Sequence, residues 1–241
     1  MDLPRGVRPA PNGSWILPKK DIELERILDA NPQLIRMRRE LRWFPKTENN
    51  IEKVFGKYKG KVASIIGKGP SLDQLSVADF PDSVEVIIAI NESIHKVESL
   101  DLPNPTFAIQ QDASLRGTCR PKRATLLIGN QVQGYYDNYP KTMIYYPQQF
   151  NLGPTSITAN IAINVAKEMG VCGFRMLCFD ACVNQNCGYA ECIGYSPDVI
   201  AVRTRFLGHC DNMKKHLVGY PVEWVTPEAP MPEQTPMPDY E

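Results

Sequence analysis

A short apolar run that ends in a glycine-rich turn is the feature that most constrains how this chain can fold. The run spans residues 62–66, contains β-branched side chains and is bounded by glycine, which is typical of a buried β-strand. The turn that follows, residues 67–72, reads GKGPSL. Its glycines let the backbone approach a ligand closely, and Pro70 and Ser71 suit the first turn of a helix. This order of elements favours an α/β protein whose turn binds a phosphorylated ligand, although an ordinary β–α turn has the same pattern.

Further strands and helices alternate along the chain. Apolar runs predict strands at residues 84–90, 106–109, 124–128, 143–146, 174–179 and 222–225. Helical spacing predicts helices at 72–78, 94–100, 155–169 and 211–217, with Thr155 or Ser156 as the cap of the third and Gly170 at its end. This alternation predicts a mostly parallel sheet with helices on both faces.

The chain divides into an N-terminal region, an α/β domain and a tail. Residues 1–60 read as an irregular arm followed by short helices at 21–28 and 33–43. Residues 61–226 form the predicted α/β domain, within which residues 181–205 are a long irregular segment of the kind that often serves as a lid. Residues 227–241 are rich in proline and are predicted to be an unpacked tail.

Polar residues gather just after the predicted strands. They are Ser71, Asn91, Asp112, Asn130 and Asp180. Ligands of open α/β sheets bind at the carboxyl ends of the strands, so the pattern predicts a site there, with Asp112 and Asn130 toward the substrate. Taken singly, each of these residues is also ordinary turn chemistry.

The composition disfavours several classes of protein. The formal net charge is +0, so no overall basic charge points to a nucleic-acid partner. No apolar stretch approaches the ~20 residues of a membrane span, and the first residues lack the apolar core of a secretory signal. The seven cysteines are predicted to be reduced thiols in the cytoplasm. Their spacing lacks the CxxC pairs of a structural zinc site, so no metal is predicted there.

Three segments resemble the bacterial family-42 sialyltransferases. GKGPSL at 67–72 resembles their GNGPSL turn, and PTSITANIAINVAKEMGVCGFRMLCFD at 154–180 resembles their Thr-Ser segment, amphipathic helix and strand ending in Asp. FLGHCDNMKKHL at 206–217 resembles the segment that carries their catalytic histidine. The same turn and helix–strand unit also resemble a related family, the 6-hydroxymethylpterin pyrophosphokinase-like proteins. The resemblance spans roughly residues 61–226.

The resemblance implies a glycosyltransferase with a Rossmann-like, GT-A-type fold that uses a CMP-linked donor and requires no cofactor. Apart from the resemblance, Asp112 at the end of a predicted strand offers a carboxylate for Mg²⁺ or for an acceptor hydroxyl. The resemblance also implies a nucleotide site made of Gly67, Lys68, Gly69, Ser71, Asn91, Thr155, Ser156 and Asp180, in which Lys68 stands where the family has Asn. His209 matches the family's general base, and Tyr189 lies near a tyrosine that hydrogen-bonds the leaving phosphate. A second tyrosine and an arginine of the family are replaced here by Cys182 and Gly153, which leaves the donor sugar open.

The chemistry of sugar transfer supports the same residues without the family. Transfer to a hydroxyl needs a base near the acceptor, and histidine has a pKa close to working pH. His209 follows Gly208 in what is predicted to be a turn before a helix, a position that can face a cleft, with a surface or capping histidine as the alternative. The leaving phosphate needs hydroxyls, cations or N–H groups aimed at it, which Tyr189, Lys68 and the helix start at Ser156 can supply.

Several alternatives stay open at this stage. An ATP-dependent pyrophosphokinase-like enzyme would need carboxylates for Mg²⁺, with Asp112 and Asp180 as candidates. A viral glycosyltransferase acting on hydroxymethylated DNA bases would track phosphates with the basic residues at 36–42 and with Arg116, Arg120, Lys122 and Arg123. A nucleotide-binding regulatory module would keep the turn without the chemistry. The leading hypothesis takes a nucleotide sugar and a hydroxyl acceptor such as a glycan as partners, and a homo-oligomer is also open.

Overall fold

The computed structural model describes the part of the chain that contains the sheet. It covers the backbone of residues 8–9 and 15–16, and residues 50–228 except 82–84, 112–118, 130–131, 133–135, 137–138, 140, 151, 153–155 and 196–202. Near the N-terminus, β1 (Arg8–Pro9) pairs antiparallel with β2 (Trp15–Ile16). The helices predicted at 21–28 and 33–43, and the tail from residue 229 onward, lie outside the described residues.

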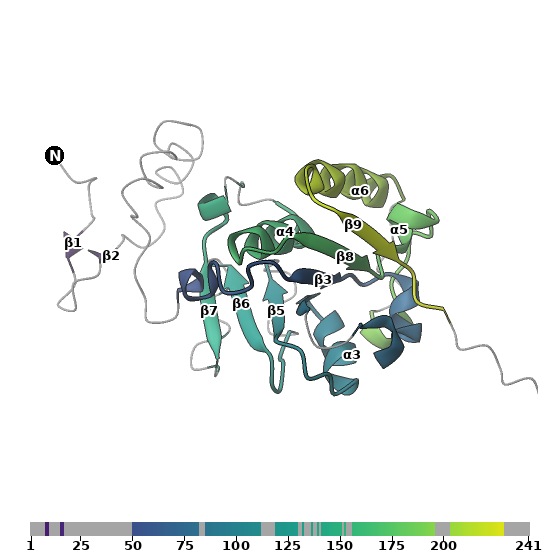
Figure 1. Cartoon of the computed structure of the whole chain (residues 1–241), viewed down its shortest axis with the longest axis horizontal. Coiled ribbons are helices and arrows are strands. Elements are labelled where there is room, and N and C mark those ends of the chain that lie inside the picture. Colours follow the sequence, from purple (N-terminus) through teal and green to yellow (C-terminus); the bar gives the residue numbers. More distant parts are fainter. Residues whose placement is uncertain are drawn as a thin grey trace, which may run out of the picture.

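Seven parallel strands form the central sheet (Figure 1). In chain order they are β3 (Val62–Ile66), β4 (Val86–Ile90), β5 (Thr106–Gln110), β6 (Thr125–Gly129), β7 (Thr142–Tyr145), β8 (Gly173–Leu177) and β9 (Val222–Val225). Every strand predicted from an apolar run is present, with ends that differ by no more than two residues. The sheet is wholly parallel, where the sequence predicted a mostly parallel one.

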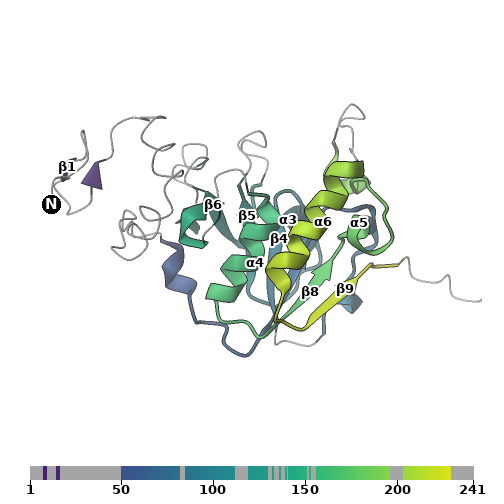
Figure 2. The ribbon, with the colours of Figure 1, turned by 90° about the horizontal axis from the view of Figure 1, so that it is seen from above.

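Helices cover both faces of the sheet, as predicted. Figures 1 and 2 show α4 (Thr158–Glu168) and α6 (Arg203–Leu217) on one face and α3 (Ser93–Ser99) on the other. A fourth described helix, α5 (Asp180–Val183), follows β8. No helix among the described residues has both the length and the apolar character needed to cross a membrane.

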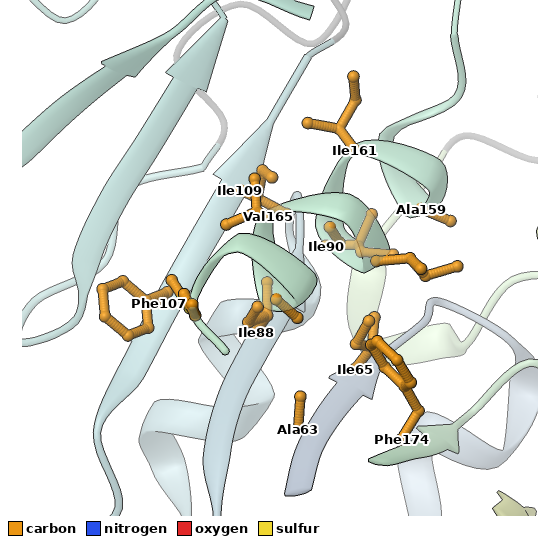
Figure 3. Close-up of a cluster of buried hydrophobic side chains, with 14 of the residues drawn as sticks. Ala63, Ile65, Ile88, Ile90, Phe107, Ile109, Ala159, Ile161, Val165 and Phe174 are labelled. Atoms are coloured by element: carbon orange, nitrogen blue, oxygen red, sulfur yellow. The ribbon is translucent and has the colours of Figure 1, made fainter. Parts of the chain in front are cut away.

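Two hydrophobic clusters, one on each face, hold these layers together. Successive residues of a strand point to opposite faces, so Ile65 and Ile88 belong to the cluster under α4, whereas Ile66 and Ile87 belong to the cluster on the side of α3. Figure 3 shows strand side chains of the first cluster, among them Ile88 and Ile109, together with Val165 of α4. Because both faces are covered, the central strands are apolar at nearly every position, and this continuous pattern is what made them visible in the sequence.

The order of the strands changes direction beside the glycine turn. The sheet order is β7-β6-β5-β4-β3-β8-β9, so β3 pairs with the next strand of the chain on one side and with the late strand β8 on the other. The winding of the chain reverses between β3 and β8. In open parallel sheets, ligands bind outside the carboxyl ends of the strands at such a reversal.

The helix predicted at 72–78 is wrong. The structure has two short 3₁₀ turns instead, η2 (Pro70–Gln74) and η3 (Val77–Asp79). Between them Ser76 is extended, and its N–H donates to the Asp79 carboxylate at 2.8 Å, which begins a new turn and stops the first from continuing.

The contact between α4 and α6 contains a titratable histidine. His216 Nδ1 lies 3.2 Å from the Asn164 Nδ2 atom, and the Lys167 ammonium donates to the carbonyl of His216. Burial, with a smaller contribution from the charge of Lys167, lowers the pKa of His216 below its ordinary value of 6.5. The folded protein therefore resists protonation of His216 more than the unfolded chain does.

We expect this histidine to make the protein less stable in mild acid. Folding lowers the pKa of His216, which becomes positive on protonation. Its contribution to the free energy of unfolding is therefore complete above its unfolded pKa and is lost as the pH falls below that value. The free energy of unfolding, measured in urea between about pH 7.5 and pH 5, should fall less in His216→Gln than in the wild type. His95→Gln, at an exposed position of α3, is the control and should fall as the wild type does. If the free energy of unfolding depends on pH equally in all three proteins, the lowered pKa of His216 is contradicted.

Candidate functional site

The glycine turn packs directly against the chain that leaves β8. The Gly67 N–H donates to the Leu177 carbonyl at 2.8 Å, and the Gly69 N–H donates to the Cys178 carbonyl at 2.9 Å. A Cβ on Gly69 would lie 2.8 Å from the Cys178 carbonyl oxygen and would overlap Asp180 Oδ2. These glycines are therefore required by the approach of two backbone segments, and both of their N–H groups have acceptors within the protein.

Asp180 places a carboxylate where the sequence predicted a phosphate. The Ser71 hydroxyl donates to Asp180 Oδ2 at 2.8 Å, and the Ser71 N–H lies 3.3 Å from both carboxylate oxygens. Both side chains are buried. The structure thus brings together four predicted site residues: Gly67, Gly69, Ser71 and Asp180. Their hydrogen bonds are made within the protein and hold the turn in place.

Lys68, between the two glycines, belongs to a hydrogen-bonded triangle. Its Nζ donates to Glu92 Oε2 at 3.1 Å and to the hydroxyl of Tyr195, and that hydroxyl donates to Glu92 Oε2 at 3.0 Å. Glu92 is 7% exposed and Lys68 is 13% exposed, so the ion pair is largely withdrawn from water. Three separate segments, after β3, after β4 and after α5, meet at this point.

Aromatic rings surround the Lys68 ammonium. It lies 4.6 Å from the ring centre of Tyr195 and 5.3 Å from that of Tyr189, within the range of a cation–π interaction. The ring centres of Tyr189 and Tyr195 are 4.8 Å apart, and Tyr189 also packs on Phe206 of α6 at 5.4 Å. We call Lys68, Glu92, Tyr189, Tyr195 and Phe206 the tyrosine–lysine cluster.

Sequence reasoning found only two members of this cluster, Lys68 and Tyr189. Glu92 carried a usable signal, because it follows directly on Asn91 at the end of a predicted strand. Tyr195 and Phe206 lie in segments without strand or helix predictions, so the hydrophobic pattern of the sequence did not indicate that they lie near β3.

The residues that bring Tyr189 and Tyr195 to the glycine turn are docked on it. Asp73 accepts the N–H groups of Glu191 at 2.7 Å and Cys192 at 2.9 Å, and the Ala190 N–H donates to the Lys68 carbonyl at 3.0 Å. Partial burial of Asp73 favours the protonated form, but the hydrogen bonds from Cys192 and Glu191 outweigh it and lower the pKa of Asp73. A negative Asp73 thus anchors this stretch.

The predicted irregular segment 181–205 is irregular at residues 184–190 and 194–195, but it also contains short elements that were not predicted. It contains most of α5, a 3₁₀ turn η7 (Glu191–Ile193) and the first residues of α6. Short elements of this kind are hard to read from periodicity, because each spans about one turn. Residues 196–202 lie outside the described residues.

Two asparagine side chains near the carboxyl edge of the sheet have a buried oxygen that accepts no hydrogen bond. Asn91 follows β4 with a positive φ of 51°, and its N–H donates to the Ile109 carbonyl at 2.9 Å. Among the described side chains, Asn91 Oδ1 and Asn160 Oδ1 are buried and accept no hydrogen bond. A buried carbonyl without a donor costs about 1–3 kcal/mol, so both atoms suit a ligand that brings N–H or O–H groups.

The start of α4 differs from the prediction. Thr155 lies outside the described residues, and the half-buried Ser156 comes two residues before the helix. The N-cap position belongs to Ile157, which has no side-chain cap and packs against the hydrophobic cluster under α4. Packing of this apolar residue overrides the capping preference of the hydroxyl residues, and it leaves the first turn of α4 without a side-chain cap.

His209 lies within α6, so the turn predicted around it is wrong. A stripe of four residues, one helical turn apart, faces the core and explains the helix: Phe206, Cys210, Met213 and Leu217. Gly208 is accommodated in this helix at a position where a methyl group would meet open space. His209 is half-buried and lies three residues after Phe206, so both occupy the same side of α6. The structure therefore places His209 one turn from the tyrosine–lysine cluster.

Cys182 and Cys210 form a disulfide, against the prediction of reduced thiols. The bond joins α5, which begins at Asp180, to α6, which carries His209. The other cysteines are free thiols: Cys119, Cys172, Cys178, Cys187 and Cys192. Pairing could not be read from the sequence because these two cysteines are brought together only by the packing of α5 on α6.

The carboxyl end of β5 is occupied by a buried polar network. The Tyr145 hydroxyl donates toward the Gln110 carbonyl at 3.0 Å and Gln111 Oε1 at 2.9 Å, and the Tyr136 hydroxyl bonds to Gln110 Oε1. Burial raises the pKa of Tyr145, which keeps its hydroxyl protonated as a donor. The predicted substrate residues that follow, Asp112 and Asn130, lie outside the described residues.

Within the described ranges, no group of three or more His, Cys, Asp or Glu side chains is arranged to hold a metal ion. The sequence matches no protein-family model, and no curated protein matches it.

The glycine turn gives a matched pair of substitutions. Gly69→Ala should lower the free energy of unfolding by about 2 kcal/mol, because the new methyl would overlap Asp180 and the Cys178 carbonyl. Gly208→Ala, in open space on α6, should instead raise it by up to about 1 kcal/mol through helix propensity. Denaturant titrations of both proteins measure the difference. A Gly69→Ala protein as stable as the wild type would show that the turn is not docked on β8 in solution.

The disulfide predicts a response to reducing agent. Reduction should lower the free energy of unfolding of the wild type by about 3 kcal/mol, because a cross-link restricts the unfolded chain. Cys182→Ala should already lack this contribution and should not respond to reductant. Cys172→Ala removes an exposed free thiol and should respond as the wild type does. Ready alkylation of Cys182 and Cys210 without reductant, seen by mass spectrometry, would contradict the bond.

Proposed function

We propose that this protein is a glycosyltransferase with a Rossmann-like, GT-A-type domain that moves a sugar from a nucleotide-sugar donor to a hydroxyl acceptor. The observation that carries the proposal is the tyrosine–lysine cluster at the carboxyl end of β3. A sugar presents hydroxyl groups, which both donate and accept, beside apolar C–H faces. The cluster offers a carboxylate acceptor, an ammonium donor and phenol rings within one small region, at the edge where open parallel sheets bind ligands.

The nucleotide part of the donor has its own partners in this proposal. Asn91 Oδ1 and Asn160 Oδ1 accept from ribose hydroxyls or a base amino group, which would satisfy two buried acceptors. The uncapped start of α4, with Ser156, receives the phosphate, since the N-terminus of a helix favours anions. Thr155, Asp112 and Asn130 stay predictions in this scheme. Gly67, Gly69, Ser71 and Asp180 hold the turn that carries Lys68.

His209 is the general base of the proposed transfer. It lies one helical turn from Phe206, whose ring packs on Tyr189, and is half-buried, so it can reach a hydroxyl beside the cluster. As the acceptor oxygen attacks the sugar carbon, its proton passes to the imidazole and the bond to the nucleotide phosphate breaks. The hydroxyl of Tyr189 then faces the departing charge, because the hydroxyl of Tyr195 already donates to Glu92.

The basic residues considered for a DNA acceptor give that alternative little support. Lys122 and Arg123 precede β6 and therefore lie at the amino edge of the sheet, opposite the tyrosine–lysine cluster. Glu98 accepts both of their N–H groups at 2.7 Å, and Arg123 forms an ion pair with Asp101. Arg116 and the residues at 36–42 lie outside the described residues.

Nucleotide binding is the first test of the proposal. Thermal unfolding should be followed with CMP, CDP, UDP, GDP, TDP and ATP, each with and without Mg²⁺. A ligand at 100 times its dissociation constant stabilises the fold by about 2.7 kcal/mol, so one of the nucleoside mono- or diphosphates should raise the unfolding temperature clearly. Stabilisation by ATP with Mg²⁺ alone would favour the pyrophosphokinase-like reaction, and no response to any of them would overturn the proposal.

Catalysis is tested on His209. With the nucleotide sugar that binds best, His209→Gln should keep the thermal stabilisation but lose about 10²–10⁴-fold in transfer or donor hydrolysis, the usual contribution of a general base. His95→Gln, on the exposed side of α3, should keep full activity. Full activity in His209→Gln would remove it as the base, whereas binding without any turnover in the wild type would favour a regulatory module.

A further inference from the structure

We propose that Glu92 makes the donor site selective for a neutral sugar, such as a hexose or hexosamine, against a sugar that carries a carboxylate. This inference rests on the proposed function and adds the chemical class of the donor. It starts from the position of Glu92, which is the deeper member of an ion pair with Lys68 and contacts the hydroxyl of Tyr195 as well.

The Glu92 carboxylate already occupies the side of Lys68 that an anionic sugar would need. Its Oε2 lies 3.1 Å from Lys68 Nζ, so a second carboxylate bound to that ammonium would come close to Glu92. Two carboxylates at such a distance in a site withdrawn from water repel each other strongly. Lys68 therefore does not serve here as a receptor for a sugar carboxylate.

A neutral hydroxyl fits the same pair without conflict. A sugar hydroxyl can donate to Glu92 or to the Tyr195 oxygen and accept from Lys68 at the same time, since it is both donor and acceptor. The ring planes of Tyr189 and Tyr195 are 85° apart, so they present two differently oriented apolar surfaces beside these polar groups. A hydroxyl-bearing ring with apolar C–H faces matches this combination, whereas an additional negative charge does not.

The nucleotide phosphate is not affected by this selection. In the proposed arrangement it lies at the uncapped start of α4 with Ser156, which belongs to a different element from the Lys68–Glu92 pair. Glu92 thus acts on the sugar alone. The test must therefore separate what the sugar adds to binding from what the nucleotide contributes.

Calorimetry on the wild type makes this separation. For UDP-glucose, GDP-mannose and CMP-sialic acid, the dissociation constant is compared with that of UDP, GDP or CMP alone, which gives the change due to the sugar. For a nucleotide that binds, a neutral sugar should tighten binding at least 10-fold, and sialic acid should leave binding to CMP unchanged or weaken it. Tightening by sialic acid but not by the neutral sugars would overturn the inference. Failure of every nucleotide to bind would overturn the proposed function and this inference with it.

Glu92→Gln then tests the residue itself. The variant keeps the shape of the side chain and removes the negative charge, so the 10-fold gain from the neutral sugar should shrink and sialic acid should begin to tighten binding. Glu52→Gln removes an exposed charge from the 3₁₀ turn η1 (Ile51–Val54) and should behave as the wild type. Unchanged discrimination in a folded Glu92→Gln protein would overturn the role of Glu92. Should that variant not fold, Tyr195→Phe, which removes one hydroxyl partner and keeps the charge pair, should lower the gain from the neutral sugar while sialic acid stays excluded.

Discussion

The docking of the glycine turn on the end of β8 is the contact on which the rest of the structure depends. Two N–H groups of the turn donate to the carbonyls of Leu177, at the end of β8, and of Cys178, just after it, and the Ser71 hydroxyl donates to Asp180. This contact joins the first and the sixth strands of the sheet at the point where the winding reverses. It also sets the direction in which Lys68 leaves β3, so the ion pair with Glu92 and the tyrosine rings around it follow from the same few hydrogen bonds.

A carboxylate in place of a phosphate changes how the turn is understood. A glycine turn before a helix is usually taken as an anion site, because glycines expose N–H groups. Here the Asp180 carboxylate accepts the N–H of Ser71, so the turn serves to hold two segments of the chain together. Among the described residues, the side-chain oxygens of Asn91 and Asn160 are buried without a donor, and they support the proposed nucleotide site better than the turn does. Tracing which N–H and carbonyl groups already have partners therefore locates the site better than the motif does.

The central strands could be predicted from the sequence because each is a largely buried apolar run, and a sheet covered on both faces leaves no polar face in their pattern. The helix around His209 was missed because its apolar stripe begins at Phe206, in a stretch rich in Arg and Gly, and only the later part read as helical. Glu92 was missed although it directly follows Asn91 at the end of a predicted strand. Tyr195 was missed for a different reason. It reaches the cluster only because distant segments of the chain pack together, and a single sequence carries no signal for that packing.

The pairing of β3 with β8 also governs the order in which the protein can be made. β3 is the first strand of the sheet to leave the ribosome, yet one of its two neighbours is among the last strands to be synthesised. Until then, the edge of β3 is open and the nascent chain can assemble only the half-sheet from β3 to β7. Completion of the sheet, and with it the contact between the glycine turn and Asp180, must wait until β8 and β9 have been synthesised, which leaves the half-sheet accessible to chaperones until then.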